Sequence, residues 1–465
     1  MELHPFLEVD QRPTARWWYV LSTTGDSPSM RVGHSATFVP GQSAGENDRV
    51  IIVGGANPSQ IFDEVWTLDL KTRTWDTLEC PGFRGRYEHA AFRVDNHPGR
   101  LFIFGGATQA GCLNDVQSMD TSSGVWTDVE VSGTAPAPRT HRSAAVIGSK
   151  VYFFSGGHCG SEPVADRSVH CLDTESWMWT AITPKGNAPK ARHGHLMLAA
   201  ASSTVEGDCG GGERIHNGCS SDVVKQGSHK EKGTATPTDL NRPNISNRIY
   251  LHGGMSGSTF FDDLHVLDVG QGAWSLVRKK RTSPVSRAAH DGLIHQGQLV
   301  IFGGMNQEGA LDDAHKFNPE GNSWSKLQFE GPAPPNRLDF AMCSIKLSVP
   351  VMSEASALDA ESELTGTSAS TKETLERELK PGSASSRGSF SDSASGDEAV
   401  FPLETVESGQ SPAQQAHFNH GADTTQAAEE APSGMTEDMH LIFIHGGMDT
   451  EGEIFDDTLV LALSS

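Results

Sequence analysis

Six times along the chain a short apolar run ends in a pair of glycines, and this repetition constrains the fold more than any other feature. The pairs are Gly54-Gly55, Gly105-Gly106, Gly156-Gly157, Gly253-Gly254, Gly303-Gly304 and Gly446-Gly447. Successive pairs are 51, 51, 97, 50 and 143 residues apart. The two long spacings fall to about 50 residues when two polar segments, 203–247 and 349–438, are set aside, and such a period indicates a propeller or another repeat array.

Three further landmarks keep the same phase. A tryptophan lies about 20 residues after five of the pairs, at Trp75, Trp126, Trp179, Trp274 and Trp324. An arginine then opens a four-residue motif, which is R-Y-E-H at Arg86, R-T-H-R at Arg139, R-H-G-H at Arg192, R-A-A-H at Arg287 and R-L-D-F at Arg337. An acidic or amide residue follows each glycine pair, at Asp63, Asn114, Asp166, Asp262, Asp312 and Asp456.

One such repeat resembles a blade of the kelch-repeat family. It combines an Arg-x-x-His strand, an apolar strand that ends in Gly-Gly, a third strand after an acidic turn and a fourth strand that carries tryptophan. An unbroken apolar run is typical of a strand buried on both faces, and glycine permits close approaches that a Cβ would obstruct. The resemblance covers the chain outside the two polar segments and implies an all-β, six-bladed propeller.

The sixth repeat is incomplete, because the chain stops after T-L-V-L at 458–461 without a tryptophan. A matching segment stands near the other terminus, where Trp18 precedes Arg31 by 13 residues. We therefore expect the N-terminal strand to complete the last blade, which removes the exposed strand edges of an open array. The predicted propeller comprises 15–348 and the remainder of blade six, 439–465.

The two polar segments are predicted to be disordered inserts. Segment 203–247 is expected as a loop in blade four, between its first and second strands. Cys209, His216 and Cys219 lie in it, but their spacing matches no established metal site. Segment 349–438, in blade six, carries 17 Asp and Glu against 4 Lys and Arg, so it cannot bury enough apolar surface to fold alone. Its serine clusters beside acids suit acid-directed kinases.

Composition narrows the functional classes. A formal net charge of −23 disfavours nucleic-acid binding, and no basic patch stands out against it. There is no secretory h-region and no apolar run of 18 residues, so we expect no transmembrane segment and a cytoplasmic location. Seven scattered cysteines without a C-x-x-C pair make neither a disulfide framework nor a zinc site and favour a reducing compartment.

Catalysis is disfavoured at the level of residues. Kelch-type copper oxidases, as a family, use two tyrosines, two histidines and a tyrosine bonded to cysteine, whereas this chain has only Tyr19, Tyr87, Tyr152 and Tyr250. The Glu-x-x-x-Asp-x-x-x-His iron motif of plant specifier proteins is absent. His34, His89, His195 and His290 recur in phase, which favours a structural role over a catalytic one. We expect no cofactor and no metal. The alternative is a metal-dependent kelch oxidase or lyase.

Protein binding is the expected function, because loops on a rigid scaffold usually carry binding residues. In peptide-binding kelch propellers the second residue after the repeat arginine can line the pocket. Those positions are Gly33, Glu88, His141, Gly194, Ala289 and Asp339, and the polar ones, Glu88, His141 and Asp339, are the candidate partner-binding residues.

Within the kelch repeats the chain is similar to the kelch-motif effectors of the small GTPase Rab nine. The strings that carry this resemblance include T-A-R-W-W-Y-V-L, V-G-G-A-N-P-S, R-H-G-H-L-M, F-F-D-D-L-H-V-L-D and R-L-D-F-A-M-C. The resemblance implies recognition of the GTP-bound Rab on endosomal membranes and transport from late endosomes to the trans-Golgi network. An endosomal phosphoinositide kinase is a second candidate partner, a scaffold for another protein is the alternative, and we expect a monomer.

Overall fold

The computed structural model describes residues 4–43, 45–158, 162–200, 247–351 and 436–463, and within these ranges the regular structure is β-strand without α-helix. Blade one comprises β3 (Ser35–Val39), β4 (Arg49–Val53), β7 (Val65–Asp69) and β8 (Thr74–Leu78). Blade two comprises β9 (Ala90–Phe92), β10 (Arg100–Phe104), β13 (Val116–Asp120) and β14 (Trp126–Asp128). Blade three comprises β16 (Ala145–Ile147), β17 (Lys150–Phe154), β18 (Val169–Asp173) and β19 (Met178–Ile182).

Blade four comprises β21 (Leu196–Ala199), β22 (Arg248–His252), β25 (Leu264–Asp268) and β26 (Ala273–Leu276). Blade five comprises β27 (Asp291–His295), β28 (Gln298–Phe302), β31 (Ala314–Asn318) and β32 (Ser323–Lys326). Blade six comprises β33 (Ala341–Pro350), β34 (Thr436–His445), β35 (Thr458–Ala462) and β2 (Trp18–Leu21). Three short strands lie along outer edges: β1 (Phe6–Leu7), β15 (Ser132–Gly133) and β20 (Lys185–Gly186). Four hairpins follow glycine pairs: β5 (Ala56–Asn57) with β6 (Gln60–Ile61), β11 (Ala107–Thr108) with β12 (Gly111–Cys112), β23 (Met255–Ser256) with β24 (Thr259–Phe260), and β29 (Met305–Asn306) with β30 (Gly309–Ala310).

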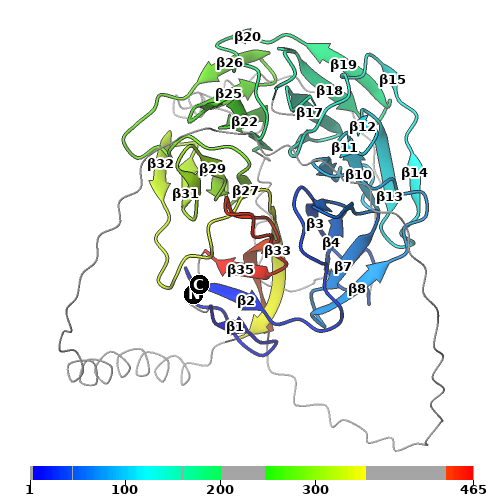
Figure 1. Cartoon of the computed structure of the whole chain (residues 1–465), viewed down its shortest axis with the longest axis vertical. Coiled ribbons are helices and arrows are strands. Elements are labelled where there is room, and N and C mark those ends of the chain that lie inside the picture. The colour runs from blue at the N-terminus through cyan, green and yellow to red at the C-terminus, as the bar shows by residue number, and fades with distance from the viewer. Residues whose placement is uncertain (1–3, 44, 159–161, 201–246, 352–435, 464–465) are drawn as a thin grey trace, which may run out of the picture. The chain divides into compact units, whose positions relative to one another are not determined.

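The blades follow one another around a central axis, and the predicted six-bladed propeller is confirmed (Figure 1). Closure occurs as expected from the position of the N-terminal tryptophan. Strand β2 pairs antiparallel with β35, with Trp18 opposite Leu461 and Val20 opposite Leu459. The first and last strands of the chain thus share one sheet, which closes the ring.

The repeated tryptophans lie at the interfaces between blades. Each begins or nearly begins an outermost strand and is at most 5% exposed. Trp179 packs against Phe104 of the preceding blade, with ring centroids 5.2 Å apart, and Trp18 packs in the same way against Phe302 at 5.3 Å. Because each large ring fills the space between two sheets, removing one would leave a cavity at a blade interface.

Ion pairs tie the buried repeat arginines to an acidic residue of the turn after each glycine pair, which is Asp166 in blade three and the residue after the landmark in the other five blades. All six arginine side chains are fully buried: Arg31, Arg86, Arg139, Arg192, Arg287 and Arg337. Arg192 is typical, because it donates to the Gly253 carbonyl at 2.8 Å and to both carboxylate oxygens of Asp263, at 2.5 and 3.0 Å. These bonds link the first strand of a blade to the loop after its second strand, which fixes the end of each blade that carries the glycine pair.

Contacts divide the chain into two units, Met1–Val9 with Pro13–Leu347 and His440–Ser465, and Asp10–Arg12 with Ser348–Met439. In the second unit Arg12 is paired with Glu437, and Ser348 donates to Asp438 at 2.9 Å. Most of the predicted inserts, 203–247 and 349–438, including Cys209, His216 and Cys219, lies outside the described residues.

Two observations bear on the expected cellular setting. In the described part of the chain no helix is long and apolar enough to cross a membrane. Among the described cysteines Cys80, Cys171 and Cys343 are free, whereas Cys112 is disulfide-bonded. No disulfide framework was predicted, and the bonded Cys112 departs from that prediction at one position.

Candidate functional site

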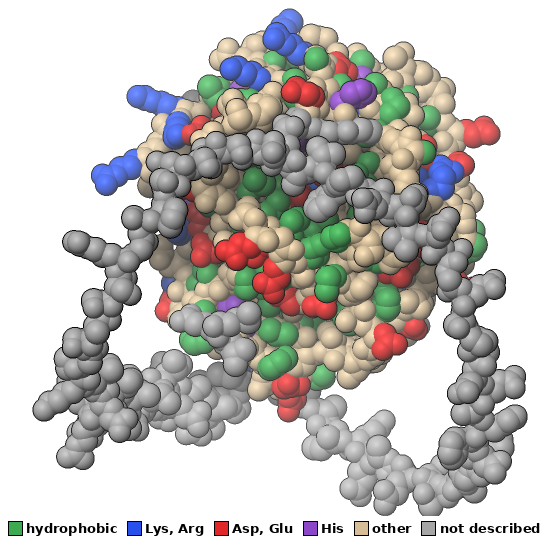
Figure 2. Space-filling model, viewed as in Figure 1, with side chains coloured by type: hydrophobic (Ala, Val, Ile, Leu, Met, Phe, Trp, Pro, Cys, Tyr) green, Lys and Arg blue, Asp and Glu red, His purple; other side chains and the backbone are tan. Residues whose placement is uncertain are grey.

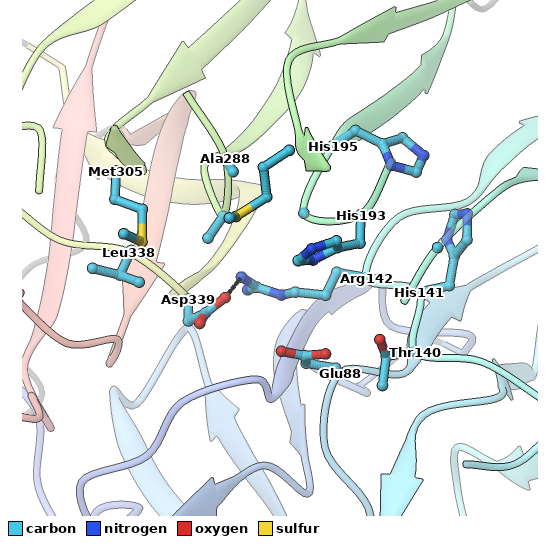
Figure 3. A pocket seen from close by; sticks show the side chains of 14 residues that line it. Glu88, Thr140, His141, Arg142, His193, His195, Ala288, Met305, Leu338 and Asp339 are labelled. Atoms are coloured by element: carbon cyan, nitrogen blue, oxygen red, sulfur yellow. Dashed lines mark hydrogen bonds and ion pairs between the residues drawn. The ribbon is translucent and has the colours of Figure 1, made fainter. Parts of the chain in front are cut away.

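The loops that carry the repeat arginines meet at the propeller axis and enclose a pocket of about 140 Å³, which we call the axial pocket (Figure 3). Its lining includes Glu88, His141 and Asp339, the three candidate partner-binding residues, together with Thr140 and Arg142. Residues from separate blades are thus brought to one site, as the repeat register predicts.

An open ring of five backbone hydrogen bonds, without a link between Gly194 and His141, holds these loops together. The N–H of His141 donates to the carbonyl of Glu88 at 2.8 Å, Glu88 donates to Gly33 at 2.7 Å, and Gly33 donates to Asp339 at 3.1 Å. Asp339 donates in turn to Ala289 at 3.0 Å, and Ala289 to Gly194 at 2.8 Å. Because every link joins neighbouring blades, the wall of the axial pocket is rigid before any partner arrives.

Blade three departs from the others at this ring. Gly33, Glu88, Gly194, Ala289 and Asp339 all adopt positive φ between 51° and 64°, but His141 does not. The first strand of blade three also begins six residues after its arginine, whereas the first strand of each other blade begins four residues after it. This altered backbone leaves Arg142, which takes the place of the repeat histidine in the motif, at the axis.

Arg142 spans the axis to the opposite blade. Its guanidinium donates to the Asp339 carboxylate at 2.6 Å and also to the Phe340 carbonyl (Figure 3). Blades three and six are diametrically opposed in a six-membered ring, so this ion pair crosses the propeller. Arg142 also lines a second pocket of about 140 Å³ that contains Asp291. It therefore lines both axial cavities.

Two carboxylates at the axis, Glu88 and Asp291, have raised pKa values. Burial raises the pKa of Glu88 to about 7, with the charge of Asp339 adding to the rise and Arg142 and the Thr140 hydroxyl opposing it. Burial also raises the pKa of Asp291 to about 6, against the effects of Arg142 and of two backbone N–H groups. The charge at the axis is therefore close to balance and changes near neutral pH.

The repeat histidines and His141 are neutral packing residues. Burial lowers the pKa of His89 to about 3 and that of His141 to about 4, and it lowers the pKa values of His34, His195 and His290 well below the usual range. His34 contacts the His445 carbonyl of the preceding blade through its Nε2 at 3.1 Å. Such groups hold blades together and are poor general bases at neutral pH.

Among the described residues no group of three or more His, Cys, Asp or Glu side chains could hold a metal ion. The four tyrosines belong to separate places: Tyr19 to β2, Tyr87 to the loop before β9, Tyr152 to β17 and Tyr250 to β22. The copper ligands of the oxidase alternative are therefore not brought together.

Sequence analysis missed Arg142, although a signal was present. The fourth position of the repeat motif is Arg142 in blade three, whereas the other blades have His34, His89, His195, His290 and Phe340 there. The only cation at this point of the repeat is thus at Arg142, and its geometric partner could not be found without the fold.

A model of the KLHDC2/KLHL20/DRC7 Kelch-repeats domain matches residues 42–225 and 234–352. The chain belongs to the kelch-repeat family. The first resemblance stated from the sequence is thereby confirmed, and the axial pocket is a site built from kelch motifs.

The more specific resemblance is confirmed as well. The chain is 34% identical over 461 residues to the Rab9 effector protein with kelch motifs of Rattus norvegicus, covering 99% of each chain. The protein of the same name from Mus musculus is 33% identical over 461 residues, 99% of this chain and 97% of the relative. That from Gallus gallus is 40% identical over 220 residues, 47% of this chain and 56% of the relative.

Proposed function

We propose that this kelch propeller is a non-catalytic scaffold that binds Rab9 in its GTP form. The observation that carries the proposal is the similarity to proteins named Rab9 effectors, which extends over nearly the whole length of both chains. In the proposed role the protein moves from the cytoplasm to endosomal membranes through the GTPase and acts in transport from late endosomes to the trans-Golgi network.

The axial pocket is the proposed contact surface. Glu88, His141 and Asp339 project from loops that the backbone ring fixes, so little conformational entropy is lost on binding. Arg142 adds a cation among the carboxylates of Glu88 and Asp339. A surface with both charges can distinguish partners by electrostatic complementarity.

Titration calorimetry with Rab9 tests the proposal directly. The purified chain is titrated with Rab9 carrying a non-hydrolysable GTP analogue and, separately, GDP. We expect binding of the GTP form at least about tenfold tighter, a difference of about 1.4 kcal/mol. Equal affinity for both forms, or no binding to either, would contradict the effector role.

A pair of variants locates the contact. Glu88→Lys changes the axial pocket, whereas Glu175→Lys makes the same charge change at an exposed turn between β18 and β19. Weaker Rab9 binding is expected for the first variant alone, with both variants folded by circular dichroism. Equal loss in both would place the contact elsewhere.

The proposal has three further parts. The protein is a monomer, and light scattering tests this. It also lacks a bound redox metal, so stoichiometric copper or iron found by elemental analysis would contradict the absence of catalysis. An endosomal phosphoinositide kinase is the proposed second partner, and failure of the purified kinase to bind the purified chain would remove it.

A further inference from the structure

The outer edges of the blades are covered in a repeated way. In blades three, four and six a short strand pairs parallel with the outermost strand: β15 with β19, β20 with β26, and β1 with β2. In blade one the backbone N–H of Trp75 donates to the Thr24 carbonyl at 2.9 Å, and in blade two the backbone N–H of Trp126 donates to the Pro81 carbonyl at 2.9 Å. A preceding segment of chain thus satisfies five of the six outer edges.

Blade five is the exception. Strand β32 has the same register as its counterparts, with Trp324 opposite Phe317 as Trp75 is opposite Leu68. In the described part of the chain, however, no backbone carbonyl accepts a hydrogen bond from the backbone N–H of Trp324. The connection from blade four, 277–286, passes without pairing with β32. An unpaired outer edge is a template for strand addition.

A lysine occupies one of the positions that the missing strand would take. In blades one, three and four, the carbonyl two residues before the tryptophan accepts from an added backbone N–H: Arg73 from Thr24, Trp177 from Ser132, and Gly272 from Lys185. In blade five the corresponding carbonyl, Asn322, accepts instead from Lys280 Nζ at 2.7 Å. Arg73, Trp177, Gly272 and Asn322 all have positive φ, so the four turns are equivalent and only the donor differs.

Open space accompanies the unpaired edge. A groove of about 410 Å³ lies between blades four and five, lined in part by Leu276, Val277, Phe317 and Asn322. In blades two and six an aromatic residue of the connection packs on the tryptophan, as Phe83 does on Trp126 with ring centroids 4.9 Å apart and Phe329 on Trp18 at 5.7 Å. The connection into blade five offers only the smaller Val277 to its core cluster.

The rim of this groove is basic. Arg278, Lys279, Lys280 and Arg281 are consecutive and exposed, a run that the sequence analysis passed over. Lys and Arg side chains gather toward the upper left rim in Figure 2, where Figure 1 places β20, β26 and β32. Leu276 and Val285 beside them are each 51% exposed. In a chain of net charge −23, this is a local field that attracts anionic partners.

We propose that the outer edge of β32 and the adjoining groove bind an extended acidic peptide segment of a partner protein, which adds to blade five as a parallel fifth strand. Its backbone accepts from the Trp324 N–H and donates to the Asn322 carbonyl in place of Lys280, while its carboxylates meet the run Arg278 to Arg281. Main-chain pairing supplies affinity and the basic rim supplies selectivity. This surface is separate from the axial pocket, and the inference does not depend on the proposed Rab9 interaction.

The chain itself supplies a probe. The segment 127–136, T-D-V-E-V-S-G-T-A-P, contains β15, the added strand of blade three, and carries two acidic residues. A fluorescent peptide of this sequence is titrated into the full chain at low salt, next to a control peptide with both acids changed to lysine. We expect saturable binding of the acidic peptide tighter than about 1 mM and at least about fivefold weaker binding of the control.

Exchange and charge variants locate the binding. Amide hydrogen exchange is expected to slow at 320–327 when the acidic peptide is present, because the Trp324 N–H gains an acceptor. The double variant Arg278→Glu with Arg281→Glu is expected to weaken binding at least about fivefold. The matched double variant Lys71→Glu with Arg167→Glu, at exposed sites in blades one and three, is expected to leave it unchanged.

Four results would overturn the inference. They are no saturable binding up to about 1 mM, equal binding of both peptides, slowed exchange at segments other than 320–327, and equal effects of the two double variants. Binding of phosphatidylserine vesicles through the basic run without peptide protection of Trp324 would likewise replace a peptide site by a membrane contact.

Discussion

Blade three and the other five blades differ where they meet the axis. The difference shows which features of the site come from the repeated motif and which come from single residues that depart from it. In the other blades a glycine with positive φ follows the second strand, and the repeat arginine binds a carboxylate closely. Blade three has Ser155 at that place, with φ 53°, and its Arg139 lies 3.7 Å from Asp166.

These departures coincide with the residue that makes the site. Asp166 is bonded to His170 at 2.5 Å and lies 3.7 Å from Arg139. The changed loop sends Arg142 across the axis to Asp339. The regular blades therefore provide the rigid wall, and the irregular blade provides the charged group at its centre.

The largest expected effect compares the two kinds of arginine. Arg192→Met leaves Asp263 and the Gly253 carbonyl without their buried donor, and we expect it to lower the free energy of unfolding by about 3 kcal/mol. Arg139→Met removes a longer ion pair and should cost only about 1–2 kcal/mol. Urea unfolding measures both. Equal losses would show that blade three is held like the others.

The glycine position gives a smaller contrast. A Cβ at Gly303 would lie 2.6 Å from the Arg337 carbonyl at φ 62°, so Gly303→Ser should cost about 2–3 kcal/mol. At Ser155 the hydroxyl accepts from the Arg192 N–H at 2.9 Å and donates to Val164 at 3.1 Å. Ser155→Gly should therefore cost about 1 kcal/mol. A neutral Gly303→Ser in thermal unfolding would refute the steric argument.

The pH dependence of stability probes the axis itself. Folding raises the pKa of Glu88 from 4.5 to about 7, so its protonated form is favoured in the folded state. The contribution is present below pH 4.5 and is lost as the pH rises to about 7. We expect the free energy of unfolding to fall on the order of 1–2 kcal/mol more across this window in the native chain than in Glu88→Gln. Parallel curves for the two proteins would contradict the assignment.

The repeat made most of the fold predictable. Glycine pairs and tryptophans recur because each blade packs its second strand and its interface with the next blade under the same steric constraints. Trp18 stands at the tryptophan position of the repeat, so it indicated that the N-terminal strand completes blade six. The ion pairs of the repeat arginines were not predicted, since Asp262 and Asp263 look alike in sequence and only the fold assigns the second to Arg192.

The charged parts of the candidate site were less accessible to sequence reasoning. Glu88, His141 and Asp339 could be named from their place in the motif. The bond between Arg142 and Asp339, residues separated by 197 positions, depends on the ring bringing opposite blades within reach. The open edge of β32 was equally hidden, because it is a missing hydrogen bond rather than a residue pattern.

The central claim is that the irregular blade supplies the group that organises the binding site. The most direct test is a double-mutant cycle with Arg142→Ala and Asp339→Ala, measured as calorimetric affinity for GTP-bound Rab9. We predict that each single variant weakens binding about tenfold and that the double variant is no weaker than either, a coupling of about 1.4 kcal/mol. Unchanged affinity in Arg142→Ala, or fully additive losses, would contradict it.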